Sequence, residues 1–309
     1  MSDALLAAFG ICAEEVHPEL DAALAFAREI GVRQVEILAF DGKPVVEHGA
    51  AALREARRRL DAAGLTCSGV GSLCLKPTLL GGIAAGQVTR DPAFRAEMEV
   101  LRASISAAEI LGAPIVRTFG FRRDGMVDMG NPGPRLPRGG EIPAPILEKI
   151  AEGLRHAAAL ASAAGLVLGL ENVRSCWANT GHNAAAVIAA TGHPALRAIW
   201  DPGNDYVSGG VPYPDGYTAL RPHICHLHVK DARVVDAASG LTAWEAVGRG
   251  ELDYTAQFAA LRRDGYTGTL SLETHWRLPA GREPHRVEAS RLSFEGIRAA
   301  LDASLGGAP

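Results

Sequence analysis

The sequence predicts a closed barrel of eight parallel strands surrounded by helices, a (β/α)8 or TIM barrel, as a single domain over residues 1–309. Three observations favour this fold. Eight short apolar runs recur along the chain, helix-like segments rich in alanine and leucine lie between most neighbouring runs, and six of these segments end in a glycine. Alternation of strand and helix is typical of a parallel sheet. Barrels of this class span about 250 residues, so one domain of this length is expected.

Glycines mark the ends of the predicted helices, where a helix commonly stops on a left-handed residue. These glycines are Gly31, Gly64, Gly112, Gly165, Gly192 and Gly265. The apolar runs, taken as strands, cover residues 6–13, 32–40, 65–73, 113–121, 166–173, 193–201, 223–232 and 266–276. The runs are continuous and do not alternate cleanly with polar residues, which indicates strands that are buried on both faces.

An open, doubly wound sheet is the alternative for a chain that alternates strands and helices. Six strands or fewer would favour that open sheet, whereas eight runs favour a closed barrel. No glycine-rich G-x-G-x-x-G loop follows the first run, which weakens a dinucleotide-binding fold further.

A long connection rich in glycine and proline covers residues 122–145. Ordinary connections from a strand to a helix take about 2–6 residues. This one follows the fourth strand, so it lies on the face where barrel active sites form. We expect a lid over the site, with a mobile surface loop as the alternative.

Composition excludes several classes of partner. The chain has 31 basic and 35 acidic residues without a basic stripe, so we expect no nucleic acid partner. Its five cysteines form no C-x-x-C pair, which argues against a disulfide framework or a thiolate zinc site and favours a cytoplasmic location. No stretch approaches the roughly 20 apolar residues that span a membrane. A small-molecule substrate is therefore expected, and a homo-oligomer is compatible with these data.

Four polar residues stand at the ends of the last four runs: Glu171, Asp201, His228 and Glu273. In a barrel, such strand ends converge on one mouth. Three carboxylates placed together repel one another, and a divalent cation removes that conflict. Three oxygen ligands and one imidazole suit Mn²⁺ or Mg²⁺ best, with Co²⁺ or Zn²⁺ as further candidates. The alternative for each residue alone is a helix cap or a surface charge.

Other residues near these strand ends are candidates for substrate contacts. His226 lies two residues before the predicted histidine ligand, on the same face but deeper in the barrel, where it is either a substrate contact or a hydrogen-bonded core residue. Lys230 lies nearer the mouth, and Arg117 sits within an apolar strand and must pair with a partner. Asn204 is a further candidate, and Trp276 is placed to stack on a sugar ring.

Several motifs in the C-terminal half resemble those of the xylose isomerase-like TIM barrels. They are LENV at Glu171, WDPGN from Trp200 to Asn204, HLHVKD from His226 to Asp231, GRGELDY from Gly248 to Tyr254, and SLE ending at Glu273. That superfamily includes sugar isomerases and epimerases, inosose dehydratase and endonuclease IV. The resemblance implies that Glu171, Asp201, His228 and Glu273 bind one metal ion, and that Glu171 and Glu273 also transfer protons.

The resemblance has two departures. Ketose 3-epimerases of this group tend to carry a histidine three residues after the aspartate, where this chain has Asn204. The third and fourth strands contain no histidine, which argues against an endonuclease IV-like metal cluster.

The sequence therefore predicts a metal-dependent isomerase or epimerase of a sugar or keto-polyol, which works by proton transfer through a metal-stabilised enediolate. The alternatives are a dehydratase of a keto-polyol such as an inosose, which would use the same metal site, and a non-enzymatic binder of metal or carbohydrate.

Overall fold

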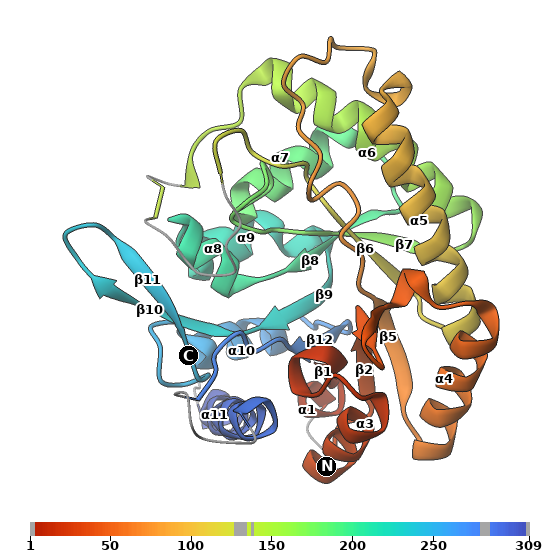
Figure 1. Cartoon of the computed structure of the whole chain (residues 1–309). Coiled ribbons are helices and arrows are strands. Elements are labelled where there is room, and N and C mark those ends of the chain that lie inside the picture. The colour runs from red at the N-terminus through yellow and green to blue at the C-terminus, as the bar shows by residue number, and fades with distance from the viewer. Residues whose placement is uncertain (1–3, 127–134, 137–138, 279–284, 307–309) are drawn as a thin grey trace.

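The computed structural model describes residues 4–126, 135–136, 139–278 and 285–306. Within these residues, eight strands close into a parallel barrel with helices around it (Figure 1). Around the barrel they are β1 (Phe9–Cys12), β2 (Gln34–Ile37), β5 (Thr66–Val70), β6 (Ile115–Phe119), β7 (Val167–Glu171), β8 (Leu196–Trp200), β9 (Ile224–Val229) and β12 (Thr269–Leu272), and β12 pairs with β1. Each predicted apolar run contains one of these strands, so the predicted fold class is confirmed.

Helices cover the outside of the barrel, and the predicted glycines end them. The longer helices are α3 (Leu20–Ile30), α4 (Ala50–Ala63), α5 (Pro92–Leu111), α6 (Ala144–Ala163), α7 (Gly181–Thr191), α10 (Tyr254–Arg263) and α11 (His285–Gly306). All six glycines have φ between 62° and 80°. A side chain is strained in this left-handed conformation, so glycine is the residue that lets each helix stop and the next strand begin.

Shorter helices stand beside the barrel, and one of them follows directly on a barrel strand. They are α1 (Ala4–Ala7), α2 (Ala13–Val16), α8 (Pro202–Ser208) and α9 (Tyr217–Leu220), with single turns at Val45–Glu47, Val88–Arg90, Pro212–Gly216 and Arg221–His223. Helix α8 starts one residue after Asp201, which places a helix N-terminus at the mouth of the barrel.

Aromatic packing joins the barrel to its outer helices. The ring of Phe9 on β1 meets Phe258 of α10 edge-on at 5.8 Å and Phe294 of α11 at 6.3 Å. All three side chains are buried. Each barrel strand is thus buried on both faces, which explains why its sequence is continuously apolar.

Two antiparallel ribbons add to the predicted fold. A short one pairs β3 (Ala39–Phe40) with β4 (Lys43–Pro44), and a longer hairpin pairs β10 (Asp231–Asp236) with β11 (Leu241–Glu245) and projects from the barrel (Figure 1). The carboxylate of Asp231 anchors this hairpin, because it accepts backbone N–H bonds from Ala232, Gly248, Gly250 and Leu252 at 2.8–3.2 Å. The loop that contains Gly248 and Gly250 is thereby tied to the base of the hairpin.

The predicted lid at 122–145 lies only partly within the described residues, since 127–134 and 137–138 fall outside them. Its last two residues belong to α6, which begins at Ala144. Arg135 donates to the carbonyl oxygens of Tyr206 at 2.8 Å and Gly210 at 3.0 Å. Closure over a substrate stays a prediction. No helix in the described ranges has the length and apolar character that crossing a membrane requires.

Candidate metal centre

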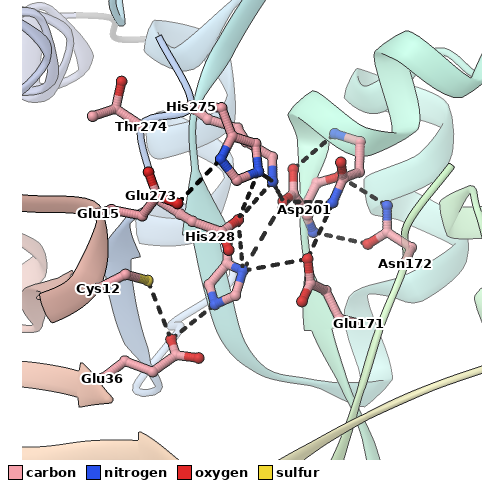
Figure 2. Close-up of polar contacts among 12 residues, drawn as sticks. Cys12, Glu15, Glu36, Glu171, Asn172, Asp201, His228, Glu273, Thr274 and His275 are labelled. Atoms are coloured by element: carbon pink, nitrogen blue, oxygen red, sulfur yellow. Dashed lines mark hydrogen bonds and ion pairs between the residues drawn. The ribbon is translucent and has the colours of Figure 1, made fainter. Parts of the chain in front are cut away.

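The four predicted metal ligands meet at the C-terminal end of the barrel (Figure 2). Glu171 ends β7, Asp201 follows β8, His228 lies in β9 and Glu273 follows β12. Each offers one ligand atom, and these atoms all lie within 4.8 Å of one another. The side chains are 0–6% exposed, so they face one another and not bulk water.

His228 has the geometry of a metal ligand. Its Nε2 lies 2.8 Å from Glu36 Oε2, and because an ionised carboxylate only accepts hydrogen bonds, Nε2 must be the donor. Its Nδ1 has no hydrogen-bond partner among the described residues and lies 3.3–4.0 Å from oxygens of Glu273, Glu171 and Asp201. An imidazole held by a carboxylate on one nitrogen and open on the other is the usual arrangement around a metal ion, so these residues fit one.

The charge balance of the buried cluster also fits a divalent cation. Among the described side chains that form it, the carboxylates are Glu36, Glu171, Asp201 and Glu273, whereas the permanent cations are Arg117 and Lys230. Burial is outweighed by these carboxylates, which raise the pKa of His228 well above its ordinary value; an imidazole whose Nδ1 bound a metal would be neutral, and negative charge would then be in excess by two. Uncompensated buried charge is costly, and a divalent cation would neutralise this excess.

Arg117, which was predicted to need a partner, pairs with three carboxylates. Its Nη1 lies 2.9 Å from Glu171 Oε2, 3.4 Å from Glu273 Oε1 and 4.0 Å from Glu36 Oε1. Burial alone would raise the pKa of Glu171, but the Arg117 guanidinium and His228 together outweigh burial and hold that pKa below its ordinary value. Arg117 therefore helps to keep Glu171 ionised.

Lys230 bridges two of the predicted ligands. Its Nζ lies 2.6 Å from Glu273 Oε2 and 2.7 Å from Asp201 Oδ2. Burial would raise the pKa of Glu273, yet Lys230 and His228 hold it well below its usual range. For Asp201, burial outweighs Lys230 and raises the pKa to about 6. The two carboxylates thus differ in their affinity for a proton.

Asn204 holds two ligands in place. Its Nδ2 donates to Asp201 Oδ2 at 2.9 Å and to Glu171 Oε1 at 3.1 Å, and its backbone N–H donates to Asp201 Oδ1 at 2.8 Å. The last bond makes Asp201 the N-cap of α8. Asp201 is therefore a helix cap and a member of the cluster at once. The Asn172 side-chain amide also fixes the backbone of Asp201. Its Nδ2 donates to the Asp201 carbonyl oxygen, and its Oδ1 accepts from the Asp201 N–H, both at 2.8 Å.

His226 lies deeper in the barrel than the cluster. Its Nδ1 is 2.6 Å from Thr269 Oγ1, and its Nε2 is 3.0 Å from Ser271 Oγ and 3.1 Å from Glu36 Oε2. Burial lowers the pKa of His226. Both ring nitrogens are engaged inside the barrel, which favours the alternative of a hydrogen-bonded core histidine over a substrate contact.

Trp244, which the sequence analysis did not single out, lies beside the cluster. Trp276 is half-buried, and its described contact is through its backbone carbonyl, which accepts a bond from Arg277 at 2.9 Å. The indole of Trp244, on β11, has the Lys230 Nζ at 5.3 Å from its centre and the His275 ring at 5.1 Å. Trp244 is therefore the aromatic side chain beside the cluster, and a role of Trp276 in sugar stacking stays a prediction.

Sequence reasoning missed Glu36, which lies on β2 and contacts both histidines of the H-x-H motif. Burial would raise the pKa of this carboxyl, but His228 and His226 together outweigh burial and hold the pKa well below its ordinary value, so Glu36 is ionised. It also missed His275, whose Nε2 lies 3.9 Å from Glu273 Oε2 and whose Nδ1 lies 3.3 Å from Glu15 Oε1 (Figure 2). A charged residue inside an apolar run, the signal that singled out Arg117, would have found Glu36.

The family model of xylose isomerase-like TIM barrels matches residues 24–299. The chain belongs to this family. The match extends into the N-terminal half, where the family motifs were weak in the sequence. No curated protein matches the chain.

Solved structures with the fold of this family cover nearly the whole chain. A xylose isomerase-like TIM barrel protein from Mycobacterium smegmatis in complex with magnesium has a TM-score of 0.64 at 18% identity, over 92% of this chain and 89% of its own. The probable 3-DHS dehydratase AsbF from Bacillus anthracis has a TM-score of 0.65 at 17% identity, over 94% and 97%. An L-ribulose 3-epimerase has a TM-score of 0.66 at 19% identity, over 96% and 95%.

Proposed function

We propose that this chain is a metal-dependent isomerase or epimerase of a sugar or keto-polyol. The observation that carries the proposal is a pair of buried carboxylates, Glu171 and Glu273, whose oxygens lie within 4.8 Å of each other in a cluster that fits a divalent ion. Both have a pKa below the ordinary value, so both are proton acceptors at neutral pH. Solved structures with this fold include an epimerase and a probable dehydratase.

The proposed roles divide the cluster into two pairs. Glu171, Asp201, His228 and Glu273 would hold one divalent metal ion, with Mn²⁺ or Mg²⁺ expected and Co²⁺ or Zn²⁺ as further candidates. When bound, such an ion supplies Lewis-acid polarisation of a carbonyl oxygen. Glu171 and Glu273 take a proton from a carbon beside the carbonyl and return it, whereas Asp201 and His228 act as ligands alone.

The cationic residues support this proton transfer. Arg117 contacts both Glu171 and Glu273 and bridges them, and its charge helps to keep Glu171 ionised, whereas Lys230 and His228 do so for Glu273. Lys230 projects its ammonium between Asp201 and Glu273 under the Trp244 ring, where it can donate a hydrogen bond to a substrate oxygen. The Asn204 amide is already engaged with Asp201 and Glu171, and it positions these ligands.

Dehydration of a keto-polyol is the second candidate, and His275 favours it. Its half-exposed imidazole lies 3.2 Å from Lys230 Nζ and 3.9 Å from Glu273 Oε2. Loss of a hydroxyl group requires a proton donor in addition to the base that removes the carbon-bound proton. The Lys230 ammonium donates to His275 Nε2, and this pair is a proton source of that kind at the edge of the cluster.

The test incubates the Mn²⁺-loaded protein in D₂O with ketoses, keto-inositols and sugar acids, and follows deuterium incorporation and loss of water by NMR. Deuterium uptake without water loss supports the isomerase or epimerase, and water loss supports the dehydratase. Glu171→Gln and Glu273→Gln are expected to abolish exchange, whereas Glu55→Gln, an exposed glutamate on α4, keeps it. If no compound exchanges with D₂O, and Glu171→Gln and Glu273→Gln both bind ligand as the wild type does, the chain is a non-enzymatic binder.

A further inference from the structure

A cavity of about 620 Å³ lies among the helices that surround the barrel. Helix α8, the single turn at Pro212–Gly216 and the first turn of α10 contribute to its walls. Of the residues that the structure describes, those that line this cavity include no member of the carboxylate cluster. A ligand in the cavity is therefore held by side chains that the proposed function does not use.

Three tyrosines line the cavity: Tyr206, Tyr213 and Tyr254. Tyr206 and Tyr254 are buried, and Tyr213 is half-buried. Small-molecule sites are typically concave and lined by aromatic and apolar side chains with a few polar groups among them. Tyrosine rings pack against other rings by offset stacking or edge-on, so this wall suits a flat aromatic body.

The charged side chains of the cavity wall already have partners. Arg135 donates to the carbonyl oxygen of Tyr206 at 2.8 Å, and its guanidinium carbon lies 4.4 Å from the centre of the Tyr206 ring. Glu251 accepts a hydrogen bond from the Tyr206 hydroxyl. Asp253 accepts one from the Ala256 N–H at 2.9 Å as the N-cap of α10. Because these groups are engaged within the fold, the cavity suits an uncharged ligand.

Gln257 gives the cavity an open hydrogen-bond donor. This residue lines the cavity and is 2% exposed. Its Oε1 accepts a bond from Trp200 Nε1 at 3.3 Å, and because an indole nitrogen only donates, this bond fixes which end of the amide faces Trp200. Gln257 Nε2 has no hydrogen-bond partner among the described residues. A buried donor without a partner is costly, so a ligand that brings an acceptor gains affinity here.

Tyr254 stands between the cavity and the cluster. Its side chain lines the cavity, and its hydroxyl accepts from the Lys230 N–H at 3.2 Å and donates to the Lys230 carbonyl oxygen at 2.7 Å. The Lys230 ammonium lies on the cluster, at Asp201 and Glu273. Binding in the cavity and binding at the cluster can therefore be distinguished by separate substitutions.

We propose that this cavity binds an uncharged, planar aromatic molecule that carries a hydrogen-bond acceptor such as a carboxamide oxygen. The tyrosine rings contact its flat body, and Gln257 Nε2 donates to its acceptor. This second site lies outside the metal centre, so the inference does not rest on the proposed function.

The first test titrates the purified protein with 4-fluorobenzamide and follows binding by ¹⁹F NMR. For a probe of this size we expect a dissociation constant on the order of millimolar or lower. Val211→Trp, at an exposed residue of the cavity wall, places a bulky ring there and should weaken binding at least about tenfold. Val235→Trp, at an exposed valine of β10 that does not line the cavity, is the matched control.

Glu273→Gln, in the cluster, should bind the probe as the wild type does. Circular dichroism verifies that the variants fold. No binding by the wild type, unchanged binding by Val211→Trp, or loss of binding in Glu273→Gln overturns the proposal.

The second test isolates the hydrogen bond from Gln257. The reference probe is 4-fluorotoluene, which has the same ring without an acceptor. In Gln257→Met, the affinity for 4-fluorobenzamide relative to that for 4-fluorotoluene should fall about tenfold from its wild-type value, as the loss of one bond from a buried donor implies. Gln87→Met, at an exposed glutamine, should leave this ratio unchanged. A change of cavity shape alone weakens both probes alike, so a wild-type ratio in Gln257→Met overturns the proposal.

Discussion

Glu36 Oε2 accepts a hydrogen bond from His228 Nε2 at 2.8 Å, although the two residues are 192 positions apart in sequence. This bond directs the other ring nitrogen of His228 towards the three carboxylates. A histidine that binds a metal is commonly oriented by a carboxylate in this way, so Glu36 is a positioning residue for the metal centre.

Glu36→Gln is expected to weaken Mn²⁺ binding about 10–100-fold, because a neutral amide holds the His228 ring less firmly and makes it a weaker ligand. Isothermal titration calorimetry measures the affinity. In the metal-free protein, the ¹⁵N chemical shifts of the His228 ring show which of its nitrogens carries a proton. These shifts should change in the variant. Glu55→Gln is the control, and wild-type affinity in Glu36→Gln would contradict the role.

Arg117→Met is expected to lower the free energy of unfolding by about 3–5 kcal/mol, because it leaves buried carboxylates without their shared cation. Urea denaturation of the metal-free protein measures this loss. Arg102→Met, on the exposed face of α5, should change it little. A loss similar to that of the control would show that Arg117 does not compensate the cluster.

Addition of Mn²⁺ at 100 times its dissociation constant is expected to raise the free energy of unfolding by about 2.7 kcal/mol, and a chelator should reverse the gain. Asp201→Asn removes one charged ligand and should abolish most of this stabilisation at the same Mn²⁺ concentration. Asp302→Asn, exposed on α11, should retain it. Thermal unfolding with and without the ion provides the measurement, and a gain in Asp201→Asn equal to that of the wild type would argue against this ligand.

Asp205 is expected to make stability depend on pH. Burial raises the pKa of its carboxyl from an ordinary 3.8 to about 7, so the folded protein keeps this proton where the unfolded chain has lost it. The free energy of unfolding therefore falls as pH rises from about 4 to 7, by up to about 1.4 kcal/mol per pH unit, and this contribution is constant above the folded pKa.

The Asp205→Asn variant tests this dependence, because an amide oxygen can still accept the 2.6 Å bond from Gly181 N–H but does not ionise. Urea denaturation at pH 4.5 and pH 7 should give a smaller loss for the variant than for the wild type. The same loss in both proteins would mean that another group titrates.

The positions of the strand ends made the clustering of these four residues predictable from sequence, whereas their role as metal ligands stays a prediction. Glu171, Asp201 and Glu273 each follow an apolar run directly, and the barrel brings such positions together. Glu36 stands inside its run, and its partners His226 and His228 become neighbours only when the barrel closes. A charged residue inside an apolar run marks Glu36 as unusual, but its histidine partners can be identified only from the closed barrel.

The hairpin explains why the sequence did not single out Trp244. The seventh apolar run passes directly from β9 into β10, so the sequence gives no sign that the chain leaves the barrel at Asp231. Trp244 lies on the returning strand, and its place beside Lys230 depends on the pairing of Ala232 with Trp244. The prediction for Trp276 rests on its nearness to Glu273 in sequence, whereas the place of Trp244 follows from the strand pairing.

The same hairpin makes one wall of the site separable from the barrel. Asp231 fixes its base through backbone N–H groups alone, and the tip between Asp236 and Leu241 lies away from the barrel wall (Figure 1). Exchange of the strands beyond Asp231 would therefore replace the aromatic wall while the four ligands stay on their own strands. For the proposed function, this predicts that exchange of β10 and β11 changes substrate range while Glu171, Asp201, His228 and Glu273 keep their places on the barrel.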